Sequence, residues 1–277
     1  MKNFSWRLQT DVPLMSVGHL NQILHSTVSD ADIRMSEHPA FTALRGTLAP
    51  KLQIVGDVAI APIQGTLAHN PDAFEILYSG VEDSRTVVAM LNEANDNPKV
   101  KGVLLNLDTP GGMLLGGPEM AYAVSALRAS GKPVVAFASG LCCSLGYMIA
   151  SQAAEIIASP SAIVGSIGVI SSVTDYTDYL ANLGIKIEYF TNDAAIFKGA
   201  GAVGSTLTDP QRAQIKASVE SAFTMFKDMV QSNRPMVKAD AMQGQTFSGQ
   251  AAKQAGLVDR IGDQNYALAV LRSYLRP

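Results

Sequence analysis

The sequence predicts an α/β protein with a mainly parallel sheet, and three observations support that class. Segments of strand and helix character alternate from residue 53 to residue 192, as in successive βα units joined by right-handed crossovers. The apolar run at residues 100–108 predicts a buried strand that ends at Pro110-Gly111-Gly112. Thr208, Pro210 and Gln211 give the start of the longest helix a capping-box pattern.

The individual elements follow from the spacing of apolar residues. Residues 1–50 are mixed and weakly periodic, so we expect an N-terminal arm or extension with a small helix near residues 20–33, followed by the main domain over residues 51–277. Short apolar or alternating runs predict strands. These lie at residues 53–65, as one strand or as two short ones broken at Gly56, and at 100–108, 133–139, 155–159, 165–172, 185–191 and 257–261. Helical periodicity, caps and glycine stops predict helices, at residues 83–96, 118–130, 144–154, 174–183, from 208 onward, 248–255 and a last one to about Leu275.

Composition limits the classes of function. Apolar residues make up 47% of the 277 residues and charged residues only 16%, so we expect a sizeable core and a homo-oligomer interface. The net charge of -3 and the lack of a Lys/Arg cluster argue against nucleic-acid binding. The N-terminus has no basic segment followed by a long apolar run, and no apolar run of about 18 residues occurs anywhere in the sequence. We therefore expect no signal peptide and no membrane span. Cys142 and Cys143 are adjacent, which favours a reduced, cytoplasmic protein.

The segment DTPGG, residues 108–112, is the first candidate for chemistry. It lies at the carboxyl end of a buried strand, which is where ligands bind in open α/β sheets. Gly111 and Gly112 allow a sharp turn and present bare N–H groups, as an oxyanion hole requires. An ordinary turn between a strand and a helix is the alternative interpretation.

The segment GLCCSLGYMIAS, residues 140–151, places Ser144 at the expected start of a helix. Helix N-terminal amides favour a developing anion there. The order strand, turn, serine and helix resembles a nucleophile elbow, although G-x-S-x-G is absent. Ser144 could instead be a helix N-cap. Cys142 and Cys143 compete as nucleophiles, but free cysteines in an apolar run are typical of inert core.

Lysine is the favoured base for Ser144. All four histidines precede residue 70, so a Ser-His-Asp triad would have to recruit His69 or the N-terminal arm. Ser-Lys pairs are an established variant. Lys198 is the single charged residue between 194 and 208, and apolar surroundings would favour the neutral amine that a base requires. A lone surface lysine in a loop is the alternative.

Taken together, these segments resemble the signal peptide peptidase A family, peptidase family S49, and within it the phage head-maturation branch. The resemblance rests on DTPGG (108–112), CCSLGY (142–147), VGSIGVI (164–170), FKGAGAVGS (197–205) and FSGQAAKQAGLVDRIG (247–262). It implies Ser144 as nucleophile, Lys198 as general base and Ser166 as the serine that orients the lysine. The oxyanion hole would use the backbone N–H of Gly111 or Gly112, together with that of Leu145. Leu145 replaces a family glycine, which would reshape the pocket beside Ser144.

The same resemblance implies a crotonase/Clp-like spiral of ββα units, and ring-shaped oligomers in which neighbouring subunits can share a site. The expected activity is that of a serine endopeptidase acting on extended polypeptide, with phage scaffold and capsid proteins as substrates inside an immature shell. It needs no cofactor or metal. Substrate would lie beside residues 166–171 and the segment after Gly112, and would contact Gly112, Met113, Ile167, Gly168 and Val169.

Three other functions stay open at this point. The first is a cytoplasmic peptidase of the same family that degrades signal peptides. The second is a crotonase-type acyl-CoA hydratase or isomerase, which usually needs a carboxylate acid/base, and the motifs contain no acidic pair. The third is a non-catalytic assembly protein that retains a relic site.

Overall fold

The computed structural model describes residues 51–72, 75–76 and 79–276, and these fall into two compact units. The larger unit comprises the described residues up to Gly168 together with those from Phe223 onward, and the smaller unit is 169–222. The expected arm over residues 1–50 lies outside the described residues. Within the described ranges, no helix combines the length and apolarity needed to cross a membrane.

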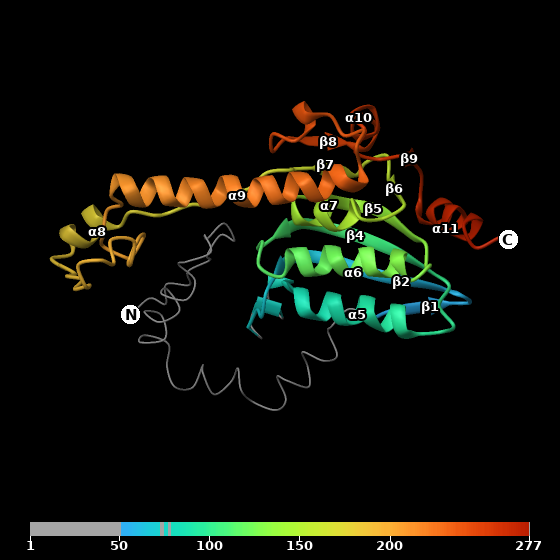
Figure 1. Ribbon diagram of the computed structural model, residues 1–277, viewed down its shortest axis with the longest axis horizontal. Coiled ribbons are helices and arrows are strands. Elements are labelled where there is room, and N and C mark those ends of the chain that lie inside the picture. Colours follow the sequence, from blue (N-terminus) through green and yellow to red (C-terminus); the bar gives the residue numbers. More distant parts are fainter. Residues whose placement is uncertain (1–50, 73–74, 77–78, 277) are drawn as a thin grey trace. The chain divides into compact units, whose positions relative to one another are not determined.

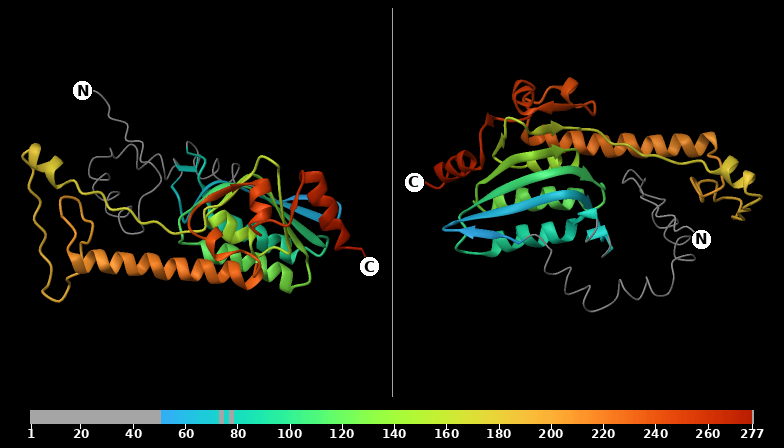
Figure 2. Two further views of the ribbon diagram at one scale, coloured as in Figure 1. Left: turned by 90° about the horizontal axis from the view of Figure 1, so that it is seen from above. Right: turned by 180° about the vertical axis from the view of Figure 1, so that it is seen from behind.

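A nine-stranded sheet forms the centre of the larger unit (Figure 1). Its main path runs in the order β1-β2-β4-β5-β6-β9, with β3 beside β2, and with β7 pairing β5 and β8. The strands are β1 (Gln53–Val55), β2 (Val58–Ala68), β3 (Glu82–Asp83), β4 (Gly102–Gly112), β5 (Val134–Cys143), β6 (Glu155–Ala158), β7 (Ile163–Gly165), β8 (Thr246–Ser248) and β9 (Arg260–Ile261). Only β1–β2 and β7–β8 pair antiparallel among these. The expected α/β class with a mainly parallel sheet is confirmed, and Figure 2 shows the sheet from behind.

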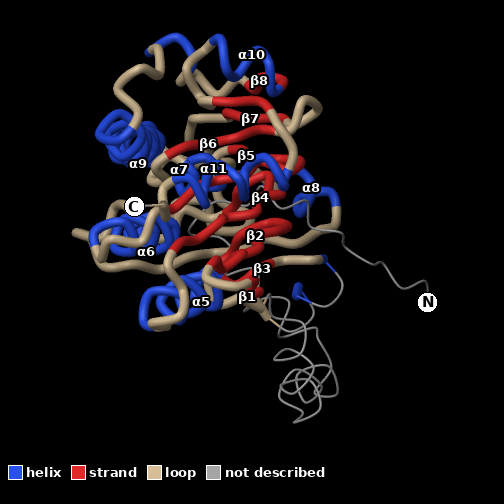
Figure 3. Tube along the Cα trace, turned by 90° about the vertical axis from the view of Figure 1, so that its right-hand side faces the viewer, coloured by secondary structure: helices blue, strands red, loops and turns tan. Residues whose placement is uncertain are grey.

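Helices cover both faces of this sheet. The C-terminal helix α11 (Gln264–Ser273) packs against one face, on Leu104, Val135 and Phe137. Since side chains alternate along a strand, their buried neighbours in β4 and β5 point to the other face. That face carries α5 (Ser84–Asp96), α6 (Gly117–Ala129) and α7 (Leu145–Ala150), and Figure 3 shows α5 and α6 on one side of the strands. The apolar stripe predicted for the first helix is buried in α5, at Val87, Met90, Leu91 and Ala94.

The longest helix, α9 (Asp209–Asn233), begins with the predicted capping box. The Thr208 amide donates to Gln211 Oε1 at 3.0 Å, and the Gln211 amide donates to Thr208 Oγ1 at 3.4 Å. Near its end, Phe226 and Val230 are buried. The predicted helices near 174–183 and 248–255 form as the shorter α8 (Thr177–Asn182) and α10 (Gly249–Gln254).

Two predicted strands do not form. Instead of a strand over residues 165–172, β7 ends at Gly165, because Ser166 adopts a φ of 52° that interrupts the extended backbone. Residues 185–191 alternate like a strand in sequence, yet they are exposed and have no regular structure. A strand is stabilised by pairing and by burial of one face, and no described segment supplies either to residues 185–191.

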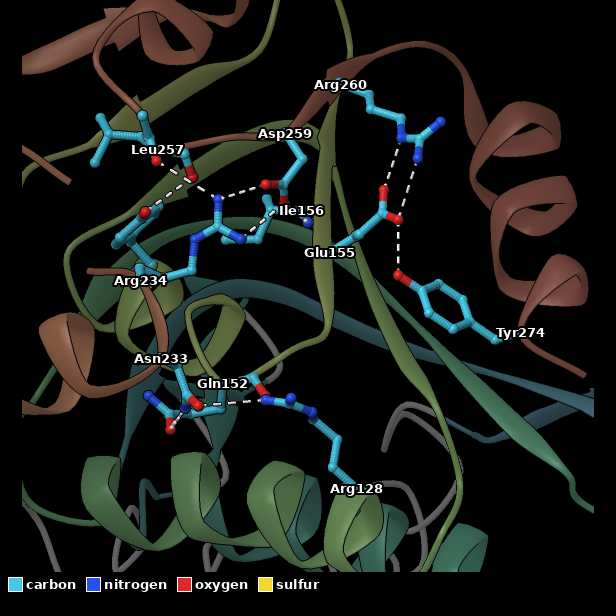
Figure 4. A network of polar contacts seen from close by, with 12 residues as sticks. Arg128, Gln152, Glu155, Ile156, Asn233, Arg234, Leu257, Asp259, Arg260 and Tyr274 are labelled. Atoms are coloured by element: carbon cyan, nitrogen blue, oxygen red, sulfur yellow. Dashed lines mark hydrogen bonds and ion pairs between the residues drawn. The ribbon is translucent and has the colours of Figure 1, made fainter. Parts of the chain in front are cut away.

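A polar network ties the end of α9 to the sheet (Figure 4). Arg234, directly after α9, makes a bidentate ion pair with Asp259 at 2.7 and 2.9 Å, and Asp259 also accepts from the Ile156 amide at 2.7 Å. The Arg234 side chain is only 10% exposed. A second pair, Arg260 with Glu155, lies nearby, but its arginine is 48% exposed. Burial therefore distinguishes the two arginines, whereas Glu155, at 16% exposed, is more buried than Asp259, at 33%.

We expect Asp259→Asn to lower the free energy of unfolding by about 2 kcal/mol, because it leaves the buried Arg234 guanidinium without its counter-charge. Glu155→Gln is the matched control, since the arginine that it leaves without a counter-charge is 48% exposed, and it should cost less than about 1 kcal/mol. Urea unfolding of both variants measures the difference. Equal losses would show that burial of Arg234 does not set the strength of its pair.

Candidate active site

Irregular strand pairing positions the DTPGG segment. At the carboxyl end of β4 the register shifts against β2 between Gln64 and Thr66, and against β5 between Leu107 and Thr109. Extra residues of this kind bend a strand and change the direction of its backbone. Here they bring the Gly111–Gly112 end of β4 against the turn that precedes α7.

Gly111 is in close contact with Ser144. Its φ is +98°, and a Cβ at this position would lie 2.7 Å from Ser144 Cβ, 2.9 Å from the Cys143 carbonyl oxygen and 2.9 Å from the Leu145 nitrogen. Distances this short leave no room for any side chain, so only glycine fits. The loop and the candidate nucleophile are therefore neighbours, as the sequence predicts.

The two glycine amides differ in availability. The buried Gly111 amide donates to Thr109 Oγ1 at 3.0 Å, so it already has an internal partner. The Met113 amide donates to the Leu67 carbonyl of β2 at 2.8 Å. Because successive amides of a strand point to opposite neighbours, the Gly112 amide points away from β2. Gly112 is also exposed, which makes its amide the better candidate of the two for an oxyanion hole.

Ser144 itself has a strained backbone. With φ 51° and ψ -119°, it is one of three non-glycine residues with positive φ in the described chain, the others being Asn70 and Ser166. Such conformations cost about 1–3 kcal/mol and cluster at functional sites. Ser144 occupies the N-cap position of α7, but its side chain makes no capping hydrogen bond. The half-buried hydroxyl is therefore not used as a helix cap.

The VGSIGVI segment joins the same site. The Ser144 amide donates to the Gly165 carbonyl at 2.8 Å, which places Ser166 next to a residue that contacts the candidate nucleophile. The Ser166 amide donates to the Gln245 carbonyl at 2.8 Å, and the Ile167 carbonyl accepts from the Gly244 amide at 3.0 Å. Residues 244–245 thus occupy one edge of this segment. Of the other expected substrate contacts, Met113, Gly168 and Val169 are half-buried and Ile167 is buried.

Lys198 belongs to the smaller unit. It lies in a run of turns, where its amide donates to the Ala195 carbonyl at 2.9 Å, and its side chain is exposed. The apolar enclosure expected around the amine is therefore not found among the described residues of the single chain. Since Ser144 and Lys198 fall in different units, their pairing stays a prediction.

The competing nucleophiles and bases are occupied elsewhere. Cys142 and Cys143 are buried, and that burial raises the pKa of both thiols, so neither is a ready thiolate. The predicted role of the cysteines as inert core is consistent with this. His69 Nδ1 lies 3.1 Å from Ser84 Oγ. Among the described residues, no group of three or more His, Cys, Asp or Glu side chains could hold a metal ion.

Thr109 is a site residue that the sequence reasoning missed. It is fully buried, and its hydroxyl donates to the Gly65 carbonyl at 2.6 Å while accepting from the Gly111 amide. Its methyl group faces Gly146 of α7, where a Cβ would come within 2.6 Å. The available signal was a hydroxyl residue at the end of an apolar strand, directly before Pro-Gly-Gly.

Leu145 does not open toward Ser144. Its side chain is buried, and its Cδ1 would lie 2.5 Å from a Cβ at Gly117, the first residue of α6. The leucine found in place of the family glycine thus fills the space between α7 and the start of α6. The predicted reshaping of the pocket beside Ser144 stays a prediction.

The larger unit is therefore an α/β structure with a candidate nucleophilic serine at the carboxyl ends of parallel strands. A profile described as "Peptidase family S49" matches residues 126–276, and this chain belongs to that family.

Individual relatives agree with that assignment. The chain is 31% identical to "Capsid assembly protease C" of Escherichia phage lambda, over 91% of this chain and 58% of the relative. It is 28% identical to "Head-tail preconnector protein GP5" of Enterobacteria phage P21, over 89% and 49%. A putative protease of Methanocaldococcus jannaschii is 31% identical, over 69% and 61%. The chain thus spans about half the length of the two phage relatives.

A crystal structure from the enoyl-CoA hydratase/isomerase family superposes with a TM-score of 0.44 and 17% identity, over 82% of this chain and 75% of that chain. Values this low carry no information about activity.

Proposed function

We propose that this chain is a serine endopeptidase with Ser144 as nucleophile and Lys198 as general base. The observation that carries the proposal is the state of Ser144: a half-buried hydroxyl on a strained turn, not used as a cap, in contact with the glycine loop at the carboxyl end of β4. Strained turns that present a serine in this way are typical of nucleophile elbows. Membership of a peptidase family supports the same reaction.

The reaction would proceed through an acyl-enzyme. Neutral Lys198 accepts the Ser144 proton as the hydroxyl oxygen attacks a peptide carbonyl. The Gly112 and Leu145 amides stabilise the oxyanion, and Ser166 orients the lysine. The lysine ammonium then donates the proton to the leaving amine, and water hydrolyses the ester in a second, equivalent step. The extended substrate would pair with the edge of residues 166–169 that Gly244 and Gln245 leave open.

A second copy of the chain would complete the site. The smaller unit exposes many large apolar side chains, namely Ile170, Val173, Tyr176, Tyr179, Leu183, Ile185, Ile187, Tyr189, Phe190, Ile196 and Phe197. Exposed apolar surface of this extent marks an interaction surface. A homo-oligomer in which neighbouring copies cover these residues would remove water from around Lys198, and this favours the uncharged amine. Sites shared between neighbouring subunits follow from this arrangement.

The proposed substrates are scaffold and capsid proteins of an assembling phage head in the host cytoplasm. This rests on the names of the phage relatives, one of which is called a capsid assembly protease. No cofactor is required for the chemistry described.

Labelling with a fluorophosphonate probe tests the proposal. We expect one covalent adduct per site, which peptide mass mapping should locate at Ser144, because an activated serine reacts with such probes. Ser144→Ala should remove the adduct. Ser161→Ala is the matched control, since Ser161 is an exposed serine between β6 and β7 and has no proposed role. An adduct that survives in Ser144→Ala, or no adduct in the assembled protein, would contradict the proposal and favour a non-catalytic assembly protein.

A further inference from the structure

Glu82 is a buried acid that the proposed chemistry does not use. It belongs to β3, which pairs in parallel with β2, and it is only 7% exposed. Its Oε2 accepts a hydrogen bond from the Gln64 amide at 2.8 Å, while Oε1 has no hydrogen-bond partner among the described residues. A buried polar oxygen without a partner is rare and calls for an explanation.

The neighbouring acid shows what is unusual about Glu82. Asp83 binds the Arg85 side chain and accepts the Arg85 amide at the start of α5. The Glu82 side chain instead accepts a hydrogen bond from the backbone of β2. Burial, the largest effect, raises its pKa to about 8, with the Gln64 amide lowering it and the Asp83 charge raising it. The carboxyl is therefore largely neutral at pH 7 and can occupy this site without a counter-ion.

The backbone that Glu82 holds leads toward Ser144. Gln64 precedes Gly65, which has a φ of +72° and fits so closely against the Gly80 carbonyl that no Cβ could be added. The Gly65 carbonyl accepts from Thr109 Oγ1 at 2.6 Å, and Thr109 Oγ1 accepts from the Gly111 amide at 3.0 Å. Gly111 in turn contacts Ser144. Apart from the peptide bond between Gln64 and Gly65, each step of this series is a hydrogen bond or a van der Waals contact.

We propose that Glu82 is a positioning residue for the oxyanion loop: by accepting the Gln64 amide it fixes the Gln64–Gly65 backbone, and through Thr109 it sets the orientation of Gly111 and Gly112 beside Ser144. The part of the proposal that concerns reactivity rests on the proposed function. The part that concerns the loop does not, because it makes a claim about backbone order alone.

Glu82→Met tests both parts. Methionine fills a similar volume and removes the acceptor, so the variant should fold. Amide hydrogen exchange at residues 109–113 should accelerate at least about tenfold, because the Gly65–Thr109–Gly111 bonds lose their support. The maximal rate of Ser144 labelling by a fluorophosphonate should fall by about tenfold or more at unchanged probe affinity, since small displacements of catalytic groups are costly. Glu82→Gln retains an acceptor and resembles the neutral carboxyl, so it should restore both values to within about threefold of the parent protein.

Three further variants complete the test. Thr109→Val breaks the next bond in the series and should reproduce Glu82→Met, while Thr109→Ser retains the hydroxyl and should not. Asp83→Asn is the matched control for loss of a buried acid. It should affect exchange at the start of α5 and leave residues 109–113 unchanged. Unchanged exchange at 109–113 in Glu82→Met would overturn the proposal whether or not Ser144 reacts. Failure of the parent protein to label at Ser144 would overturn the proposed function, while the exchange data would still decide the role of Glu82.

Discussion

Replacing Lys198 with alanine should reduce acylation of Ser144 by about 10³-fold or more, because no other described side chain is proposed to take the serine proton. Lys198→Arg should be equally inactive. A guanidinium remains charged at neutral pH and cannot act as a base, whereas a lysine that only stabilised the loop by its charge would tolerate the exchange. Single-turnover kinetics with a peptide ester or a fluorophosphonate measures the loss.

Lys216 provides the control for Lys198, because it lies in the same unit and is exposed on α9. The Lys216→Ala variant should react like the parent protein. Full activity of Lys198→Ala would remove the lysine from the mechanism and leave Ser144 without its proposed base.

Mixing two inactive variants tests whether the site is shared. If Ser144 of one copy works with Lys198 of its neighbour, co-assembly of Ser144→Ala with Lys198→Ala subunits should restore up to about a quarter of the parent activity. In a random mixture of equal amounts, about one contact in four joins an intact Ser144 to an intact Lys198 of the next subunit. If both residues act within one chain, the mixture should stay inactive. The oligomer itself is checked by light scattering on the same samples.

Much of the larger unit could be predicted from the sequence because its elements are specified locally. The apolar stripe of α5 and the glycine stop after α6 are short-range patterns that the structure confirms, and so is the capping box of Thr208 and Gln211 in the smaller unit. The placement of DTPGG at a carboxyl strand end follows from the general geometry of parallel sheets. The contact between Gly111 and Ser144 also depends on the register shifts that turn the end of β4 toward α7.

What could not be predicted depends on partners distant in sequence or on another chain. The register shifts that turn β4 toward α7 arise from pairing with two other strands. The alternation at residues 185–191 predicts a strand, but no described segment pairs with it. Glu82 and Asp83 look alike in sequence before a helix, and only the fold directs one carboxyl to Arg85 and the other to the Gln64 amide. Among the described residues Lys198 is exposed, so the apolar enclosure predicted from its neighbours in sequence is not supplied by them.

Gly111→Ala should abolish the reactivity of Ser144 while leaving most of the fold intact. Two costs combine at this position. The φ of +98° is unfavourable for any residue with a Cβ, and that Cβ would meet Ser144 Cβ, the Cys143 carbonyl and the Leu145 nitrogen, all within 2.9 Å. Two of these atoms are backbone and cannot move without shifting the start of α7. We expect the rate of Ser144 labelling to fall by about 10²–10³-fold, the loss typical of a displaced oxyanion-hole donor.

Gly131→Ala separates the two costs. Gly131 has a φ of +88°, similar to that of Gly111, but a Cβ there would meet nothing within 4 Å. This variant should lose about 1 kcal/mol of unfolding free energy from the backbone alone and label at the parent rate. The difference between the two variants therefore measures the contact with Ser144. If Gly111→Ala labels as fast as Gly131→Ala, the β4 loop does not control the serine, and the oxyanion hole must be sought among other amides.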